Sequence, residues 1–408
     1  MTPTTPDDLT RFPGQIGRTS AIPGQFRGIA PGSGANLLGV YVHVPFCSSR
    51  CGYCDFNTYT ATELGGTVRR DSFHEVLGAE VALAARTVGR RTVDTVFVGG
   101  GTPTLLGAEA LVSVLERIRD EFDVAPDAEV TTEANPDSVD EAMLADLLEG
   151  GFTRISFGMQ SSAPAVLRVL DRTHTPGASI AVARAARRVG FEHVNLDLIY
   201  GTPGETDDDL RRSLDDALAA DVDHVSAYAL IVEDGTPLAR RIARGELDAP
   251  DDDVAADRYV IVDQVLRDAG FAWYEVSNWA RPGGECRHNL VYWHNSDWWG
   301  IGPGAHSHLA GTRWWNVKHP RTYADRLALG ESPEQAREEL DQDQQRVERV
   351  MLGLRLAEGL PVDAGARDRA AAETANGLLD ADAMRAGRLV LTDAGRLVAD
   401  GVVRRLLA

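Results

Sequence analysis

Short apolar runs rich in β-branched residues alternate with longer amphipathic runs over much of this chain. The first strand-like runs lie at residues 40–44 and 95–98, and the runs after them, at 72–88 and 108–122, have the apolar spacing of helices. Repeated strand–helix units form parallel sheets, because each helix returns the chain to the start of the next strand. About six such units predict an α/β fold, a partial (β/α)6 TIM-like barrel with its functional residues at the carboxyl ends of the strands.

The alternation also predicts how the chain is divided. Residues 1–36 are dense in Pro, Gly, Thr and Ser without periodicity, which predicts a disordered lead-in. We expect the barrel at 37–240 and, at 241–330, an aromatic and His-rich region that completes it. Residues 331–408 follow as a C-terminal α+β, winged-helix-like domain, with expected helices at 344–357, 364–379 and 393–407 and a short strand at 388–391.

The charge of the chain restricts its partners. The formal net charge is −20, and Lys318 is the only lysine. A nucleic-acid-binding surface needs clustered Lys and Arg facing phosphate, so we expect no nucleic-acid partner. No stretch approaches the roughly 18 apolar residues of a transmembrane segment, and no signal peptide is recognisable at the N-terminus. We therefore expect a cytoplasmic protein.

Three of the four cysteines, Cys47, Cys51 and Cys54, fall within eight residues directly after the first strand. Three thiolates on one short loop can bind three irons of a [4Fe-4S] cubane and leave the fourth iron open to an amino-acid-like chelate. A structural zinc site needs four closed ligands, usually as two separated pairs, and no second pair exists here. A redox C-x2-C pair would leave Cys47 unexplained. The spacing therefore favours the cluster.

The same loop resembles that of the radical S-adenosylmethionine (SAM) superfamily, marked by C-x3-C-x2-C with an aromatic residue, here Tyr53, before the third cysteine. Residues 96–104 are similar to the superfamily's glycine-rich motif. Residues 132–136, 154–161 and 195–201 follow in the order found in the branch that contains oxygen-independent coproporphyrinogen III oxidases and the HemW family of haem chaperones. The resemblance extends from about Leu38 to the C-terminus.

The resemblance implies a set of cofactor residues. It implies cluster ligation by the three clustered cysteines and SAM binding by Tyr41, Tyr53, Gly100, Gly101, Thr102, Glu133, Gln160, Arg172 and Asp197. Glycines allow close approach of backbone to ligand, and a carboxylate within an apolar strand needs a partner, which agrees with these positions. Taken singly, each has a structural alternative: the glycines a turn, Glu133 a surface carboxylate, and Arg172 with Asp197 an internal ion pair.

Two features bear on the choice between enzyme and haem carrier. The oxidases of this branch have a further cysteine just after the third cluster cysteine, whereas here Cys54 is followed by Asp55, Phe56 and Asn57, as in the HemW family. This departure argues against coproporphyrinogen III dehydrogenase activity. The expected function is a haem chaperone that passes haem to haem-accepting proteins. The alternative is a radical SAM oxidoreductase acting on a porphyrinogen, so enzyme activity and a homodimer are left open.

The second feature is residues 285–293, which resemble the His-Asn-x-x-Tyr-Trp motif of the HemW family. Haem needs an axial nitrogen or sulfur donor and flat apolar walls. His288 is the leading candidate ligand, Cys286 an alternative, and Tyr292 and Trp293 are candidate walls, with His306 a weaker candidate ligand. The alternative is core packing, in which the histidines are satisfied by hydrogen bonds.

Overall fold

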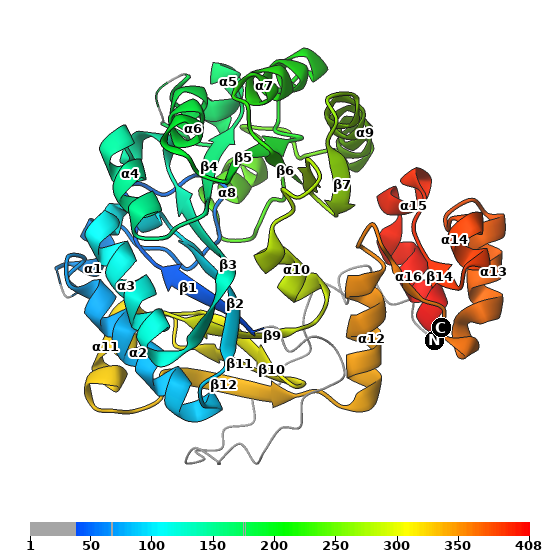
Figure 1. Ribbon diagram of the computed structural model, residues 1–408. Helices are drawn as coiled ribbons and strands as arrows, with labels where there is room; N and C mark the ends of the chain where they lie inside the picture. The colour runs from blue at the N-terminus through cyan, green and yellow to red at the C-terminus, as the bar shows by residue number, and fades with distance from the viewer. Residues whose placement is uncertain (1–37, 67, 174, 176) are drawn as a thin grey trace. The chain divides into compact units, whose positions relative to one another are not determined.

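The computed structural model describes residues 38–66, 68–173, 175 and 177–408, so the predicted lead-in at 1–36 lies outside the described residues. At the centre of the described sheet, six parallel strands are hydrogen-bonded in chain order (Figure 1). They are β1 (Leu38–Val44), β2 (Thr92–Gly100), β3 (Asp123–Ala134), β4 (Arg154–Gln160), β5 (His193–Tyr200) and β6 (His224–Ala229). The sheet does not close on itself within the described chain, and the predicted partial (β/α)6 barrel is confirmed.

Helices connect the strands as predicted. They are α1 (Ala61–Leu64), α2 (Phe73–Val88), α3 (Ala108–Glu121), α4 (Glu141–Glu149), α5 (Pro164–Val169), α6 (Ala178–Val189), α7 (Asp207–Ala219), α8 (Pro237–Ala243) and α9 (Asp252–Asp268), with 3₁₀ turns at Pro103–Leu106 and Pro136–Ser138. Their termini follow the sequence closely. The Thr206 hydroxyl, for example, accepts a hydrogen bond from the backbone N–H of Asp209 and begins α7.

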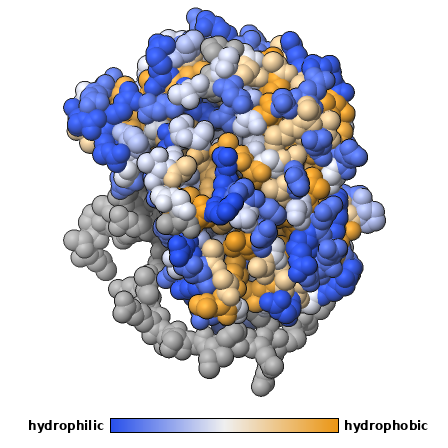
Figure 2. Space-filling view, turned by 90° about the vertical axis from the view of Figure 1, so that its left-hand side faces the viewer, coloured by the Kyte–Doolittle hydropathy of each residue, from blue (hydrophilic) through white to orange (hydrophobic). Residues whose placement is uncertain are grey.

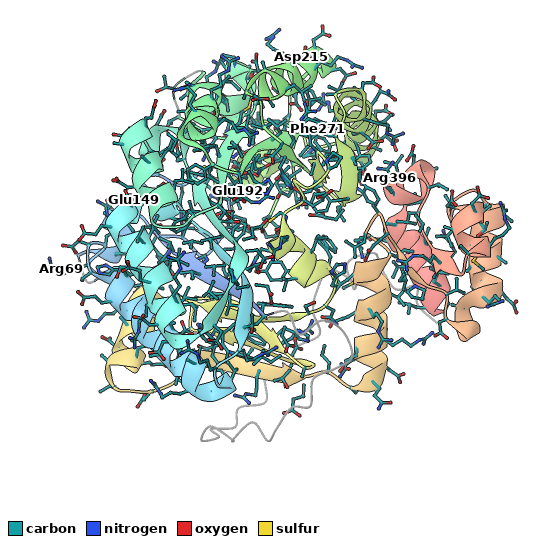
Figure 3. The ribbon with its side chains drawn as sticks, viewed as in Figure 1. Arg69, Glu149, Glu192, Asp215, Phe271 and Arg396 are labelled. Carbon is teal, nitrogen blue, oxygen red and sulfur yellow. The ribbon has the colours of Figure 1, made fainter. Side chains whose placement is uncertain are left out.

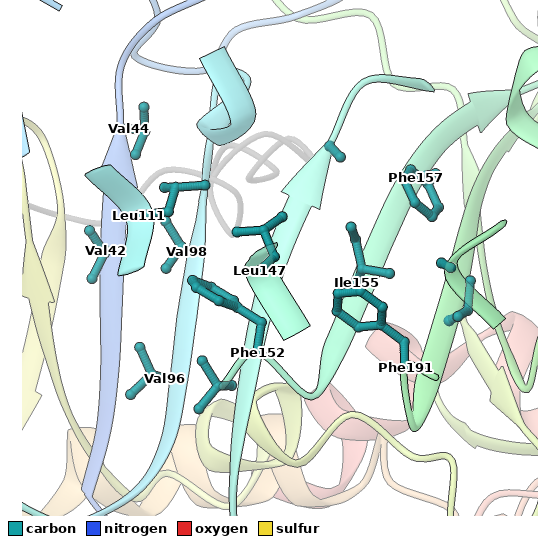
Figure 4. Close-up of a cluster of buried hydrophobic side chains, with 14 of the residues drawn as sticks. Val42, Val44, Val96, Val98, Leu111, Leu147, Phe152, Ile155, Phe157 and Phe191 are labelled. Carbon is teal, nitrogen blue, oxygen red and sulfur yellow. The ribbon is translucent and has the colours of Figure 1, made fainter. Parts of the chain in front are cut away.

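The main core lies between the strands and the covering helices. Alternate residues of β1, Val40, Val42 and Val44, are at most 1 % exposed. With Val96 and Val98 they pack against helix residues such as Leu111 and Leu147 (Figure 4). Since side chains of a strand alternate between faces, the residues between them, including Tyr41 and His43, belong to the opposite, inner face of the barrel. Polar residues on that face are therefore available to a site.

The region after α9 extends both edges of this sheet. On the β6 side it adds β8 (Asn278–Ala280), antiparallel to β6, and then β7 (Ala272–Glu275), antiparallel to β8. Helix α10 (Arg287–Trp293) follows in the chain. On the β1 side it adds β9 (Asp297–Ile301), parallel to β1, and then β10 (His306–Leu309), β11 (Thr312–Asn316) and β12 (Glu334–Glu339), with α11 (Pro320–Ala328) before β12. The last strand of the large sheet thus lies beyond residue 330.

The C-terminal residues have a core of their own, which includes Leu354, Leu379 and Val402. The elements are α12 (Gln342–Gly353), β13 (Leu360–Pro361), a 3₁₀ turn (Ala364–Ala366), α13 (Arg367–Ala375), α14 (Ala381–Arg385), β14 (Arg388–Leu389), α15 (Asp393–Leu397) and α16 (Ala399–Leu407). Strands β13 and β14 pair antiparallel. The expected single helix at 393–407 is wrong: Val398 has non-helical dihedral angles (φ −126°, ψ 27°), and the chain turns there between α15 and α16.

Arg396 on α15 joins this C-terminal part to the barrel (Figure 3). Its Nη1 lies 3.1 Å from Asp263 Oδ1 on α9, and its guanidinium lies over the Trp273 ring on β7. The winged-helix likeness of this part stays a prediction. The face in Figure 2 shows hydrophobic groups interspersed with hydrophilic ones. Over the stretches that the structure describes, none of the helices combines the length and the apolar character of a bilayer span.

Candidate functional site

A cavity opens at the carboxyl ends of β1 to β5, where the fold predicts function. It is lined by all three clustered cysteines and by eight of the nine predicted SAM residues: Tyr53, Gly100, Gly101, Thr102, Glu133, Gln160, Arg172 and Asp197. These residues come from five strand ends or the loops that follow them. The fold therefore brings together groups that lie up to 150 positions apart in the sequence.

The cysteine loop is closed at its base by backbone hydrogen bonds. The N–H of Cys47 donates to the carbonyl of Tyr59 (3.0 Å), and the N–H of Tyr59 donates to the carbonyl of Pro45 (2.7 Å). The three thiols between these points are free and half-buried. A loop fixed at both ends in this way holds its cysteines at one mouth of the barrel.

The glycine-rich segment packs directly against this loop. The N–H of Gly101 donates to the carbonyl of Val44 (2.8 Å), and the N–H of Thr102 donates to that of Phe46 (2.7 Å). A Cβ atom on Gly101 would overlap the carbonyl of Phe46 and lie 2.9 Å from Cys47 Sγ. Only glycine allows this close approach of the segment to the cysteine loop.

The donor set fits an iron–sulfur cluster. Among the described residues no three His, Cys, Asp or Glu side chains surround a single ion, and a cubane distributes its thiolates over separate irons. Burial raises the pKa of Cys47 and raises that of Cys54 to about 11. Both thiols are therefore protonated at neutral pH without metal, and iron binding would release these protons. Arg172 Nη1 lies 3.4 Å from Cys51 Sγ and can donate to an anionic sulfur.

Two carboxylates at the other side of the cavity fit a cationic ligand. Glu133 accepts a hydrogen bond from the N–H of Gly100 (3.0 Å), and burial together with the nearby Asp197 raises the pKa of Glu133 to about 8. Asp197 accepts hydrogen bonds from Ser156 Oγ (2.8 Å) and Asn195 Nδ2 (2.7 Å), and burial raises its pKa. Within the described stretches neither carboxylate forms a salt bridge. The amino and sulfonium groups of SAM would supply the missing positive charge.

Arg172 and Gln160 complete the wall of the cavity. Arg172 Nη2 donates to the carbonyl of Gly158 (2.7 Å), and its buried Nε has no hydrogen-bond partner in the described chain. No salt bridge joins Arg172 to Asp197 in the described chain, although the positive charge of Arg172 acts to lower the pKa of Asp197. Gln160, the last residue of β4, has a positive φ of 64°, a costly conformation for a residue with a Cβ, and it holds its side chain at the cavity.

Tyr41 is the exception among the predicted SAM residues, because it does not line the cavity. Its hydroxyl lies 3.0 Å from His43 Nδ1, and its ring packs against Phe97, with ring centroids 6.3 Å apart. His43 Nε2 in turn bonds to the carbonyl of Asn57. Tyr41 thus contacts the cysteine loop indirectly, through the His43 ring that bonds to Asn57.

Four of the five haem candidates, Cys286, His288, Tyr292 and Trp293, lie on or next to α10 and do not line the cavity. The carboxylate of Glu129 holds the start of this helix: Oε1 accepts the N–H of His288 (2.9 Å), and Oε2 accepts that of Arg287 (3.1 Å). Glu129 also forms a buried salt bridge with Arg154 (2.9 Å). The Cys286 thiol lies 3.5 Å from Glu129, and burial raises its pKa. Cys286 is therefore a neutral thiol, and unlike the clustered cysteines it is buried and does not line the cavity.

The His288 ring is completely buried, and both of its nitrogens are engaged. Nδ1 lies 2.8 Å from Thr95 Oγ1, and Nε2 lies 2.8 Å from the hydroxyl of Tyr292. Burial lowers the pKa of His288 to about 4. Trp293 hydrogen-bonds the buried carboxylate of Glu275. This arrangement is the core packing named as the alternative, and haem ligation by His288 would require the ring to give up one of these two hydrogen bonds and to leave the core.

Sequence reasoning missed the polar groups that hold the cavity residues. Ser156 and Asn195 position Asp197, and Gly158 leaves room for Arg172 and Gln160, whose side chains would lie within 3 Å of a Cβ there. A signal was present. Within otherwise apolar strands these residues recur at every second position, which is the spacing of one strand face.

Comparison with known proteins agrees with this geometry. The family model of the Radical SAM superfamily matches residues 41–217. The "Heme chaperone HemW" of Mycobacterium tuberculosis is 58 % identical over 388 residues, which is 94 % of this chain and 98 % of that protein. HemW of Bacillus subtilis is 36 % identical over 79 % of this chain and 85 % of its own. The solved structure of Escherichia coli coproporphyrinogen III oxidase (HemN), a radical SAM enzyme, matches with a TM-score of 0.78 and 23 % identity, covering 91 % and 90 % of the two chains.

Proposed function

We propose that this chain, which belongs to the HemW family of the radical SAM superfamily, is a haem chaperone that binds haem and delivers it to haem-accepting proteins. The observation that carries the proposal is its 58 % identity to a protein named as a haem chaperone, over nearly the full length of both. The likeness to the oxidase, at 23 % identity, concerns the fold alone.

Membership of the superfamily implies a [4Fe-4S] cluster and SAM. A bound cluster supplies one-electron chemistry and an iron open to a chelating ligand. We propose that Cys47, Cys51 and Cys54 hold the cluster, with Arg172 donating to a sulfur. Glu133 and Asp197 bind the positive groups of SAM, while Gly100, Gly101 and Thr102 bring backbone close to it. Tyr53 and Gln160 close the cavity around the ligand, and Tyr41 positions the loop.

We further propose that the protein acts in the cytoplasm, because clustered thiols persist in a reducing compartment. Haem transfer would take place between soluble partners or at the surface of membrane proteins, and a homodimer is compatible with the cluster acting as an assembly switch. Sedimentation of the cluster-loaded and cluster-free protein tests the last point: a change in mass on loading supports the switch, and equal masses contradict it.

The main test separates the chaperone from the oxidoreductase. Reduced protein with a reconstituted cluster is incubated with coproporphyrinogen III and SAM, and in parallel is titrated with ferric haem. We expect no protoporphyrinogen and a stable Soret band that disappears when haem moves to an apo-haem acceptor. Clear turnover of the porphyrinogen, or no haem binding by the wild-type protein, would overturn the proposal.

A further inference from the structure

A histidine outside α10 has the properties that His288 lacks. His306, the first residue of β10, has an exposed side chain. Within residues 38–408, the undescribed positions 67, 174 and 176 apart, neither of its ring nitrogens has a hydrogen-bond partner. The rings of His288 and His308, by contrast, are bonded at both nitrogens. An exposed imidazole with unshared nitrogens can accept a metal without disturbing the fold.

The ring of His306 is nevertheless held in one orientation. It pairs across the strands with Trp315 on β11, and the two rings stack with centroids 5.6 Å apart and planes 24° from parallel. Trp298 Nε1 donates to the carbonyl of His306 (3.1 Å) and fixes the backbone there. An iron bound to a ring nitrogen would lie in the plane of the imidazole, and its porphyrin would stand roughly perpendicular to that plane. The edge of the Trp315 indole would then meet the porphyrin face, a favourable edge-to-face arrangement.

Positive charge lies next to this ring. Partial burial of the ring, which Trp315 covers on one face, and the charges of Lys318 and Arg313 lower the pKa of His306 against the opposing effect of Glu338, so its imidazole is neutral at pH 7. Lys318 is exposed and forms no salt bridge within the described residues. It is the only lysine of the chain, and its charge acts on the His306 ring. A ligand carrying carboxylates would pair with it.

The segment that carries His306 and Lys318 is joined to the cysteine loop. Asn57 Nδ2 donates to the carbonyls of Pro303 (2.9 Å) and Lys318 (2.8 Å). Gly304, with φ +75°, lies so close that a Cβ there would be 2.7 Å from Asn57 Nδ2. The neighbouring Phe56 is 61 % exposed and also lines the cavity. A planar apolar ligand at His306 would therefore bind beside the loop that holds the cluster.

We propose that His306 is the axial ligand of haem in this protein, with Lys318 pairing with a propionate and Trp315 contacting the porphyrin face. The proposal deepens the proposed function, because it takes haem as the cargo. The new bond is a coordinate one: a ring nitrogen donates its lone pair to the iron, and no atom is oxidised or reduced. His288 then keeps α10 in place and does not touch the cargo.

The test is a ferric haem titration of the full-length, cluster-loaded protein followed by Soret absorbance. The variants are H306A and H306M, with H288A as the competing candidate and H294A as the control for an exposed histidine elsewhere. We expect H306A to weaken haem binding by about tenfold or more and to lose the histidine-type spectrum. Added imidazole should restore the spectrum in H306A, and H306M should shift the band. K318Q should weaken binding less, and K318R should bind as the wild type does.

The outcomes separate the two proposals. A wild-type protein that binds no haem removes the haem function altogether. A wild-type Soret band that is unchanged in H306A and H306M but lost in H288A leaves the chaperone function standing and overturns the assignment to His306. Loss of the band in H306A without rescue by imidazole, when H306A and wild type melt at the same temperature, also contradicts direct ligation.

Discussion

The side-chain amide of Asn57 donates a hydrogen bond to the carbonyl of Pro303, 246 positions further along the chain, at 2.9 Å. A second hydrogen bond from the same nitrogen reaches the carbonyl of Lys318. One amide thus fastens the cysteine loop to the turn before β10. The cysteine loop carries the proposed cluster ligands, and the hairpin of β10 and β11 carries the proposed haem ligand. The two proposed sites are therefore held by the same amide.

Removing the side-chain amide of Asn57 should loosen both the cysteine loop and the hairpin of β10 and β11. We expect N57A to lower the free energy of unfolding by about 1–2 kcal/mol, since the two carbonyls lose their donor. N57D, which keeps the size but places a carboxylate against two carbonyls, should lower it at least as much. Urea unfolding measures the change. Unfolding of N57A at the wild-type urea concentration would show that the contact contributes nothing.

Glu133 should make the stability of the ligand-free protein depend on pH. Its pKa is about 8 in the folded protein and, like any exposed glutamate, about 4.3 when unfolded. The folded state therefore holds the proton more tightly, so the contribution of this group to stability is lost as pH rises from about 4.3 to 8. The glutamine of E133Q does not titrate, so this variant does not lose stability at that position as the pH rises. We expect E133Q to melt increasingly above the wild type between pH 5 and pH 8, with no further divergence above that range.

The same substitution should have the opposite effect on the ligand. Without the Glu133 carboxylate, SAM loses a charge-assisted hydrogen bond, which corresponds to about a tenfold or greater rise in its dissociation constant. Equilibrium dialysis with labelled SAM on the cluster-loaded protein measures this. A variant that is stabilised without SAM and still binds SAM like the wild type would remove Glu133 from the site.

Arg172 should tune the cluster. Its guanidinium faces the sulfur of Cys51, and a positive charge there favours the more negative, reduced state of a cluster. We expect R172A to keep its iron and to have a more negative reduction potential, by about 60 mV for each tenfold change in the redox equilibrium. R168A, on the exposed face of α5, is the control and should be unchanged. A potential unaffected by R172A would contradict the contact.

Glu129 should be essential for the fold around α10. E129Q leaves the buried Arg154 without its counter-charge and weakens the hold on the helix start. Breaking a buried pair in this way costs about 3–5 kcal/mol. The exposed pair of Glu141 and Arg188 is a matched control, and E141Q should cost about 0–1 kcal/mol. Equal melting temperatures for the two variants would contradict the structural role of Glu129.

Much of the fold could be predicted because most strands and helices are indicated by the pattern of apolar residues within their own segment. The apolar runs around Val42 and Ile155 are short and β-branched, and they became strands in the predicted order. The cysteine spacing also sufficed to place Cys47, Cys51 and Cys54 on one loop. These features depend on near neighbours in the sequence, which periodicity detects.

The rest depends on contacts between distant segments. The bond between His288 and Thr95 joins positions 193 apart, which the sequence could not indicate, whereas Tyr292 lies only four residues further along α10. His306, the weaker candidate in the sequence, has no hydrogen bond to its ring nitrogens within the described residues. Tyr41 shares the inner face of β1 with His43 and bonds to it, so it lies outside the cavity lining. Close packing between distant segments also determines the glycine at 395, where a Cβ would overlap the carbonyl of Leu378.

The most direct test of the central claim is anaerobic reconstitution with iron and sulfide, followed by iron analysis and electron paramagnetic resonance of the reduced protein. The account predicts about four irons per chain in the wild type and in C286A, and none in a variant with Cys47, Cys51 and Cys54 all replaced by Ala. A wild-type protein without cluster signals, or a triple variant that retains its iron, would contradict it.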